Sequence, residues 1–328
     1  MNFVERLAQR IVSAPLKRPP LATSFREFQW SAAIPFFLLH LVPLGALWTG
    51  AHLRDFVVCG VLYVVRMFGV TGVYHRYFSH RTYKTSRVFQ FMLAFLAQTS
   101  AQKGALWWAA HHRTHHKFSD KPGDPHNSTR GFWYSHVGWI LDRTDETDYS
   151  KIKDLAKYPE LVLLNKIPNI ASLTLGLAVY LLFGWSGLFI GFALSTVLLW
   201  HGTFTINSLA HMIGKPRYDA DDNSKNSLIL ALITLGEGWH NNHHYFQGST
   251  RQGFFWWEID ITYYILKMLS WVGLVWDIKP PPARAYDPKN MLKHASAEKP
   301  LLAPVAAAAV AEAVEAVARP SVFPDPAA

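Results

Sequence analysis

The sequence predicts an integral membrane protein with four transmembrane helices and a histidine-rich metal site on one side of the membrane. Half of its 328 residues are hydrophobic, and only 17% are charged. Apolar runs recur at close to the roughly 20 residues that an α-helix needs to cross about 30 Å of hydrocarbon. Many of the 16 histidines gather in short clusters near the ends of these runs.

The apolar runs and the charges between them predict the topology. The two short connections, after the first and after the third run, are nearly uncharged, whereas Lys and Arg concentrate in the rest of the chain. The positive-inside rule therefore places both termini and the large middle loop in the cytoplasm. The net charge of +9 fits a basic rim facing a membrane, so no nucleic-acid partner is expected. The expected spans are 31–49, 56–75, 167–185 and 186–206.

Three regions are expected along the chain. Residues 1–30 form a basic cytosolic segment, residues 31–280 the main domain, and residues 281–328 an Ala/Pro-rich tail of low complexity. Two further apolar segments, 88–106 and 228–236, are expected to be helices that are buried in protein or dip into the membrane without crossing it.

Two histidine clusters repeat one pattern, H-x-x-H-H. Residues three or four apart share a helix face, which groups His112 with His115 and His116, although His111 and His115 also have suitable spacing. The downstream cluster "HNNHH" repeats the pattern with His240, His243 and His244. His111 then aligns with Trp239, which cannot bind a metal, and is excluded from the predicted ligands.

Two further pairs complete the predicted site. His75 and His80 are five residues apart, so on a regular α-helix they diverge. They converge only if the helix ends near His75, where the second apolar run stops. Asn207 and His211, in "NSLAH" at the end of the fourth run, have i,i+4 spacing and can face one site, Asn207 acting through a water.

Nine imidazoles are too many for one octahedral ion and suit two. A structural zinc site would need four ligands and usually includes Cys, but the chain has a single cysteine, Cys59. Imidazole also binds iron well. The sequence therefore predicts two non-haem iron ions that activate O₂.

The motifs "HRYFSHRTYK", "HHRTHHKFSD", "DPHNSTRGFWYSHVGW", "NSLAH" and "GEGWHNNHHYFQ" resemble those of the membrane-bound fatty acid desaturases, in the Δ9 (stearoyl-CoA desaturase-like) branch. The resemblance covers roughly residues 25–280. It implies an all-α membrane protein with four transmembrane helices and a cytosolic helical cap that holds a di-iron centre. The ligands it implies are the nine histidines, with Asn207 holding a metal-bound water.

The same resemblance implies the reaction and the substrate site. The family removes two hydrogens from adjacent methylenes of a long acyl chain with O₂, which gives a cis double bond, here expected at Δ9 of a saturated acyl-CoA. Gln102, Trp108 and Thr203 match residues that shape a kinked acyl tunnel, although ordinary helix packing also explains them. Ala110 and His111 stand where animal members have Arg and Asp, so glycerolipid-bound chains are an alternative substrate. Arg143 is the candidate for head-group contact.

The remaining expectations concern partners and neighbours of the site. No dinucleotide fingerprint or haem-binding extension is visible, so electrons should come from an acidic ferredoxin or cytochrome b5-type carrier with its reductase. Asp124, Glu237, His126 and His136 are candidate partners of the ligand imidazoles. A hydroxylase with the same metal centre is the nearest alternative, and a metal transporter is a remote one, because its histidines would line the spans. No role is expected for His40, His52, His201 or His294. A bacterial inner membrane is the expected location.

Overall fold

The structure, a computed structural model, describes residues 2–14, 29–142 and 146–292. Arg143 and His294 lie outside the described residues, as does most of the predicted tail. Strand structure in the described part is confined to an antiparallel pair and two isolated bridges, so the described fold is almost entirely helical. The pair consists of β1 (Lys84–Thr85) and β2 (Val275–Trp276), with Lys84 opposite Trp276.

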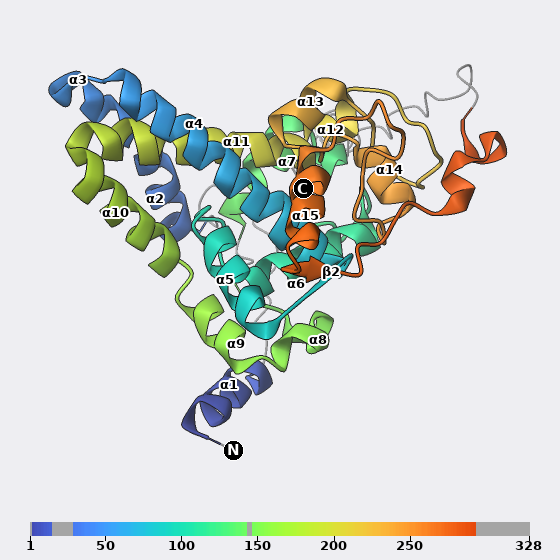
Figure 1. The fold of residues 1–328 in the computed structure, drawn as a ribbon, viewed down its shortest axis with the longest axis horizontal. Helices are drawn as coiled ribbons and strands as arrows, with labels where there is room; N and C mark the ends of the chain where they lie inside the picture. Colours follow the sequence, from blue (N-terminus) through green and yellow to red (C-terminus); the bar gives the residue numbers. More distant parts are fainter. Residues whose placement is uncertain (1, 15–28, 143–145, 293–328) are drawn as a thin grey trace, which may run out of the picture.

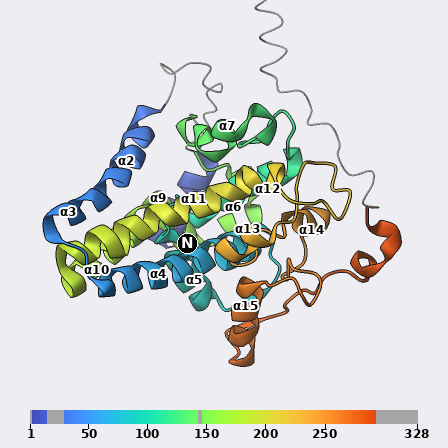
Figure 2. The same ribbon diagram turned by 90° about the horizontal axis from the view of Figure 1, so that it is seen from above.

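Long helices gather at one end of the molecule and short helices form a cap at the other (Figures 1 and 2). All four apolar runs of the sequence are helical and belong to the long-helix end. The first comprises α2 (Trp30–Leu41), η2 (Val42–Gly45) and α3 (Ala46–Thr49), and the second α4 (Leu53–Phe68) and the π-helical η3 (Gly69–Ser79). The third and fourth comprise α10 (Ile170–Ser186), π-helical η7 (Gly187–Leu194), α11 (Ser195–Asn207) and α12 (Leu209–Met212).

Two continuous helices are long and apolar enough to cross a membrane, Leu53–Ser79 and Ile170–Met212, and a shorter apolar helix covers Ala33–Thr49. The helical run Ile170–Met212 is interrupted at Gly184, whose φ of 70° lies outside the range of a right-handed helix. Figure 1 shows α10 and α11 as two arms that meet near this break. The described chain thus has four helical rods where four spans are predicted, and their crossing of a membrane stays a prediction.

A buried arginine ties two of these rods together. The guanidinium of Arg66 on α4 donates to the hydroxyls of Thr196 (2.7 Å) and Ser195 (2.5 Å) on α11. Arg66 is fully buried. Without these acceptors a charge in this position would be very costly, because apolar surroundings solvate it poorly. The contact therefore fixes the C-terminal half of α4 against the start of α11.

The cap is built from short helices around α6, which packs against the η3 end of the second run. Tyr74, Tyr77 and Leu106 lie in its main hydrophobic core and are almost inaccessible to solvent. Its elements before α10 are α1 (Phe3–Ser13), α5 (Arg87–Gln98), α6 (Ala105–Phe118), η4 (Ser128–Arg130), α7 (Phe132–His136), η5 (Gly138–Leu141), η6 (Tyr149–Lys151), α8 (Lys153–Ala156) and α9 (Pro159–Lys166). Those after α12 are α13 (Leu228–Ile233), α14 (His240–Tyr245), α15 (Ile261–Trp271), η8 (Ala283–Tyr286) and η9 (Pro288–Asn290).

The structure corrects two sequence expectations. The second helix does not end near His75: it continues as η3 to Ser79, and the backbone N–H of His80 still donates to the carbonyl of His75 at 3.2 Å. The low-complexity tail does not begin at residue 281, because Ala285 is buried and the N–H of Leu292 donates to the carbonyl of Arg217. Ala285 and Leu292 therefore lie beyond residue 280, the predicted end of the main domain, but pack as part of that domain.

The two apolar segments of uncertain role form short helices. Segment 88–106 becomes α5, a left-handed turn at Ala101 and Lys103 (φ 55° and 65°), and the start of α6. The α5 helix has 12 residues, which is too short to span a membrane. Segment 228–236 contains α13, which has only 6 residues. Both agree with the expectation that neither segment crosses the bilayer.

Candidate metal centre

Nine histidines that lie up to 169 residues apart in the chain converge in two adjacent sets. The ring nitrogens within each set lie within 4.8 Å of one another. We call them the five-histidine set and the four-histidine set. The first consists of His75, His80, His112, His116 and His243, and the second of His115, His211, His240 and His244. These are the nine histidines that the sequence predicts, and His111 belongs to neither set.

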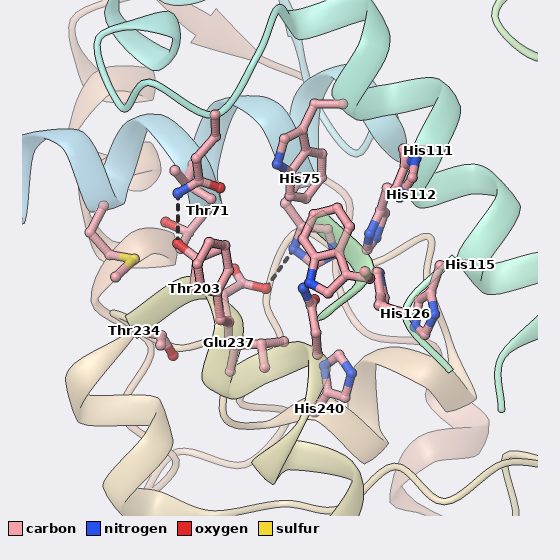
Figure 3. Close-up of a pocket in the computed structure, with 18 of the residues that line it drawn as sticks. Thr71, His75, His111, His112, His115, His126, Thr203, Thr234, Glu237 and His240 are labelled. Carbon is pink, nitrogen blue, oxygen red and sulfur yellow. Dashed lines mark hydrogen bonds and ion pairs between the residues drawn. The ribbon is translucent and has the colours of Figure 1, made fainter. Parts of the chain in front are cut away.

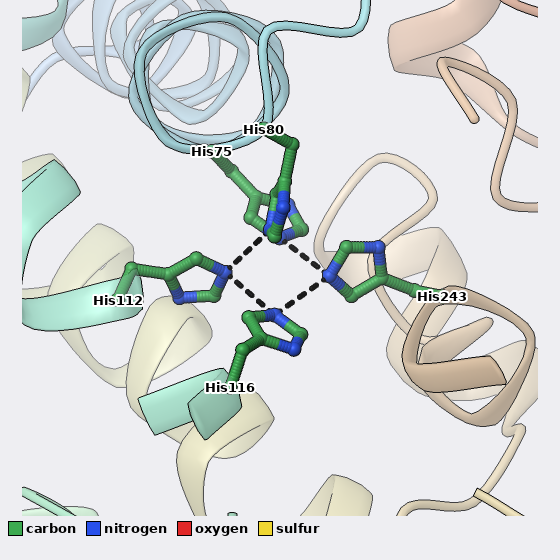
Figure 4. Close-up of side chains that lie close together, drawn as sticks. All are labelled: His75, His80, His112, His116 and His243. Atoms are coloured by element: carbon green, nitrogen blue, oxygen red, sulfur yellow. Dashed lines mark hydrogen bonds between the residues drawn. The ribbon is translucent and has the colours of Figure 1, made fainter. Parts of the chain in front are cut away.

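The π-helical geometry of η3 brings His75 and His80 together. A π-helix bonds residue i to i+5, so residues five apart lie over one another, which a regular α-helix prevents. The two rings lie 4.9 Å apart between centroids. Figure 4 shows both side chains leaving the same helix and pointing at the three other members of the five-histidine set. The sequence spacing indicated convergence, but it could not show that a wider helix, rather than a helix end, produces it.

The two H-x-x-H-H helices each serve both sets. On α6, His112 and His116 join the five-histidine set and His115 the four-histidine set. On α14 the division is reversed, with His243 in the former set and His240 and His244 in the latter. The repeated motif therefore describes two helices that each contribute side chains to both histidine sets, and not one helix for each set.

The ring nitrogens approach one another too closely for neutral imidazoles without a cation. Nε2 of His243 lies 3.0 Å from that of His75 and 2.9 Å from that of His116. His112 makes 2.9 Å contacts with both His80 and His116 through the same atom. A neutral imidazole carries one proton, and a nitrogen that is shared between two such contacts cannot donate to both. Lone pairs that converge in this way fit a bound cation.

Carboxylates outside the sets orient several of the imidazoles. Nδ1 of His115 lies 2.9 Å from Asp124, and Nδ1 of His75 lies 2.5 Å from Glu237. Two partners that no sequence motif indicated act in the same way: Asp120 on His211 at 2.8 Å and Asp222 on His244 at 2.5 Å. A carboxylate that accepts from Nδ1 leaves the Nε2 lone pair for a metal.

The four-histidine set contains direct evidence of a missing partner. His244 Nδ1 is engaged by Asp222, yet its Nε2 is buried and has no hydrogen-bond partner. A buried nitrogen without a partner is costly. Because Nε2 points at the nitrogens of His115, His211 and His240, a cation at their centre would satisfy it. The donor set thus fits two metal ions, each held chiefly by neutral imidazole.

Charge balance at the site depends on these carboxylates. Burial would raise the pKa of Asp120, but the nearby His211 ring and hydrogen bonds from Ser128 and Asn223 lower that pKa well below its usual value. His244 has the same effect on the pKa of Asp222. Burial and the neighbouring rings lower the pKa of His112, His116 and His243. Anionic carboxylates and neutral imidazoles are the protonation states that metal binding requires. His211 differs, because burial lowers its pKa but the Asp120 carboxylate raises it to about 8, so this ring would release a proton when a metal binds.

A narrow apolar pocket approaches the centre from one side, with about 60 Å³ of free volume (Figure 3). Its walls include His75, His112, His115 and His240, together with Asn207. The predicted tunnel residues Gln102, Trp108 and Thr203 also line it, and the amide of Gln102 donates to the Thr203 hydroxyl at 3.0 Å. Trp108 stacks on His112 with 4.9 Å between ring centroids. The pocket thus leads along these three residues to the metal ligands.

His111 and His126 line the pocket beside the centre. His111 stacks on Trp107 at 4.6 Å, and burial lowers its pKa to about 3. His126 packs on His115 at 4.3 Å and lies 3.7 Å from Asp124, which agrees with its predicted place around the ligands. His126 converges with His115 and Asp124, their ligand atoms lying within 4.8 Å of one another, whereas His111 belongs to no such group in the described structure.

His136 is not where the sequence placed it. It bonds neither a predicted ligand nor a carboxylate. Instead its Nδ1 lies 3.0 Å from the Ser208 hydroxyl and its Nε2 lies 3.0 Å from His201, which in turn contacts His40 at 3.0 Å. This chain of rings joins α7, α11 and α2 and ends beside Asn207. The three histidines share no local motif, so the sequence carried no signal of their contact.

Comparison with known proteins identifies the family. The fatty acid desaturase family model matches residues 51–271, which is more than half of the chain. The chain belongs to the fatty acid desaturase family. It is 36% identical over 268 residues to an sn-1 stearoyl-lipid 9-desaturase of Synechocystis, covering 78% of this chain and 82% of that protein. Membership makes the chain an oxidoreductase that desaturates fatty acyl groups.

Relatives with different substrates match this desaturase almost equally well. An acyl-CoA 5-desaturase of Anemone leveillei is 35% identical over 253 residues, 74% of this chain and 77% of that protein. The Delta-9 acyl-lipid desaturase 1 of Arabidopsis thaliana is 34% identical over 253 residues, 75% of this chain and 80% of that protein. Similarity alone therefore does not choose between acyl carriers.

Adjacent histidines on α6 provide a matched test of the ligand set. We expect His112→Gln to lose at least one of two bound metal ions per chain, because its Nε2 contacts two other ligands. We expect His111→Gln to keep both. Metal analysis of purified, iron-loaded protein measures this directly. Equal metal content in the two variants would contradict the assignment.

Asp120 provides a test of the outer carboxylates. Because it orients His211, we expect Asp120→Asn to weaken metal binding about 10- to 100-fold. Its depressed pKa keeps Asp120 ionised above the usual aspartate pKa of about 3.9, so the contact is lost only as pH falls through the lower, folded-state value. The loss of metal affinity in Asp120→Asn, relative to the wild type, should therefore be the same across neutral and mildly acidic pH. Competition with a chelator measures the affinity.

The matched control for that experiment is Asp221→Asn. Asp221 is the exposed neighbour of Asp222, and its carboxylate pairs only with Lys121. Its replacement should leave metal affinity unchanged. If both variants bound metal as the wild type does, the outer carboxylates would have no role in holding the centre.

Proposed function

We propose that this protein is a Δ9 desaturase that uses two iron ions and O₂ to introduce a cis double bond into a saturated long acyl chain. The observation that carries the proposal is the narrow apolar pocket whose inner wall consists of predicted metal ligands. The reaction converts a –CH₂–CH₂– unit, O₂, two electrons and two protons into –CH=CH– and two waters. The iron ions, when bound, supply the oxidising power that unactivated C–H bonds demand.

The residues of the pocket have the task of holding one pair of methylenes beside the metal site. Trp108 presents a flat face between His112 and Tyr74, stacking on both. The polar side chains of Gln102 and Thr203 form a hydrogen bond with each other. They can therefore line an apolar tunnel without leaving a polar group unpaired. Such a rigid wall sets where the acyl chain bends, and hence which carbons face the metals.

For the acyl carrier we propose a membrane glycerolipid, whereas the sequence favoured acyl-CoA by its resemblance. A second cavity of about 520 Å³ adjoins the first and shares Gln102, Trp108 and Phe204 with it. It extends between α2 and α10, where Phe36, Leu39, Ser172 and Leu173 line it. An acyl chain that is still attached to a lipid could enter sideways from the bilayer by this route. The missing charges at Ala110 and His111 also remove a feature suited to CoA.

The topology that accompanies this proposal is the predicted one. Exposed apolar side chains on the outward faces of the rods, such as Phe37, Leu38 and Leu177, suit contact with lipid. We propose that all four rods cross the membrane and that the metal centre and both termini face the cytoplasm. Electrons then come from a cytosolic one-electron carrier.

Expression in a host without Δ9 desaturation tests the activity. We expect mass spectrometry to find cis-Δ9 products in the host lipids; hydroxylated chains instead would favour the related hydroxylase reaction, and no modified chain would contradict both. Thr203→Val leaves the Gln102 amide without its acceptor, at a cost of about 1–3 kcal/mol. We expect it to spread the double bond over neighbouring positions or reduce activity, with metal content intact.

The control for the tunnel is Thr205→Val, on the same helix. Its hydroxyl donates to the carbonyl of Gly202, and the residue does not line the pocket. It should retain both activity and bond position. Unchanged products from Thr203→Val would contradict the tunnel assignment while leaving the activity itself established.

Substitution in the cavity between α2 and α10 tests the carrier. Ser172 is 6% exposed and lines this cavity, so Ser172→Phe should narrow it. We expect desaturation of stearoyl-phosphatidylglycerol in nanodiscs to fall on the order of tenfold, whereas Leu177→Phe, on the outer face of α10, should not reduce it. If the wild-type protein converted stearoyl-CoA but not stearoyl-phosphatidylglycerol under the same conditions, the glycerolipid proposal would be contradicted.

A further inference from the structure

Three members of the five-histidine set, His80, His112 and His116, are partly exposed, and His112 lines the substrate pocket. All members of the four-histidine set are buried, as are His75 and His243. His80 and His116 are partly exposed, and both line a surface hollow of about 440 Å³. The hollow therefore borders the five-histidine set directly.

The hollow and the substrate pocket lie against different ligands. The pocket is lined by His75, His112, His115 and His240, and includes neither His80 nor His116. The hollow includes those two and none of the pocket's ligands. An acyl chain in the pocket would therefore leave the hollow open to another molecule.

Basic side chains surround the hollow. Arg113 and Lys117 belong to its wall. Arg81 lies 4.0 Å from the carboxylate of Asp154, which also pairs with Arg113 at 2.7 Å. Arg284 lies over the ring of Phe246, next to the wall residue Gln247. Asp154 thus pairs with two of these cations, Arg81 and Arg113, and the wall of the hollow contains basic side chains but no carboxylate.

Lys117 is the cation best placed to meet a partner. It is exposed, directly follows His116, and its ammonium lies over the ring of Phe118 at 5.2 Å. In the described part of the chain no carboxylate comes within ion-pairing distance of it, whereas Arg113 is engaged by Asp154. Its charge is therefore available to an acidic surface.

We infer that this hollow, which we call the basic hollow, is the docking site of an acidic one-electron carrier protein that reduces the centre through the edges of His80 and His116. The inference rests on the proposed function, whose reaction consumes two electrons. Two carrier molecules would each deliver one electron in turn; the electrons and two protons reduce O₂ together with the two hydrogens taken from the acyl chain. Electron transfer slows steeply with distance, so the exposed ligand edges favour this entry point.

Charge complementarity selects an acidic protein over other occupants. Opposite charges around the contact would steer the carrier to the hollow and make association sensitive to salt. The hollow is lined by polar and basic groups, chiefly Arg113, Lys117 and Gln247, so an acyl chain would not bind there. The same arrangement keeps the carrier and the lipid substrate apart.

Charge reversal at Lys117 tests the inference. The probe is a plant-type [2Fe–2S] ferredoxin, with a soluble cytochrome b5 domain as a second acidic carrier, and binding of the oxidised carrier is measured by fluorescence anisotropy at low and high salt. We expect Lys117→Glu to slow association about tenfold at low ionic strength and Lys117→Gln to have a smaller effect. Rates with all proteins should converge at high salt.

The control is Lys267→Glu, which changes the net charge equally. Lys267 is exposed on α15, outside the hollow. It should leave carrier binding unchanged. The inference would be overturned if both charge reversals weakened carrier binding equally, or if Lys117→Glu left carrier binding unaffected. It would also be overturned if neither carrier bound the wild type in a salt-dependent way.

Reduction by a small mediator separates this inference from the proposed function. With dithionite and methyl viologen as reductant, Lys117→Glu should desaturate as fast as the wild type, and only the carrier-driven rate should fall. Absence of desaturation with the mediator in every protein would refute the proposed function. A local, salt-dependent loss of carrier binding would still support the docking site in that case.

Discussion

The structure depends on the convergence of imidazole lone pairs at two points. Bringing neutral ring nitrogens within about 3 Å of one another, as His75 and His243 are, is unfavourable unless a cation takes their place as the common partner. The binding free energy of the metals must therefore offset both this repulsion and the burial of the rings. Two bound metal ions would thus join side chains from η3, α6, α12 and α14.

The second requirement is that each ligand present the correct nitrogen. Asp120, Asp124, Asp222 and Glu237 meet it by accepting from Nδ1. Glu237 is itself held by the buried Arg76, which also pairs with Asp260 at 2.9 Å. On α14 Asn242 donates to Glu258 at 2.9 Å and Asn241 donates to the carbonyl of Tyr218 at 3.0 Å, so the two asparagines of "HNNHH" fix the helix while its histidines join the two sets. A six-residue helix has little stability of its own, and these contacts explain its position.

The sequence predicted the ligands better than the geometry that unites them. The histidine motifs predicted which nine histidines converge in the structure and left out His111, because helical spacing is a local property. The widened π-helix at His75 and His80 was not predictable, since it results from packing around the site. Asp120 and Asp222 were missed for a similar reason: an aspartate in a loop has no spacing that reveals which distant ring it contacts. The chain of His40, His201 and His136 depends likewise on contacts between distant helices.

The arrangement separates three functions around one centre. In the proposed function the pocket at Trp108 and Thr203 would receive the acyl chain and the cavity between α2 and α10 would connect that pocket with the lipid side, while the basic hollow is lined by His80 and His116. Crystallography at the iron absorption edge tests most directly whether two cations unite them. From iron-loaded crystals the account predicts two anomalous peaks, one inside each histidine set. A single peak, or a peak outside the two sets, would contradict it.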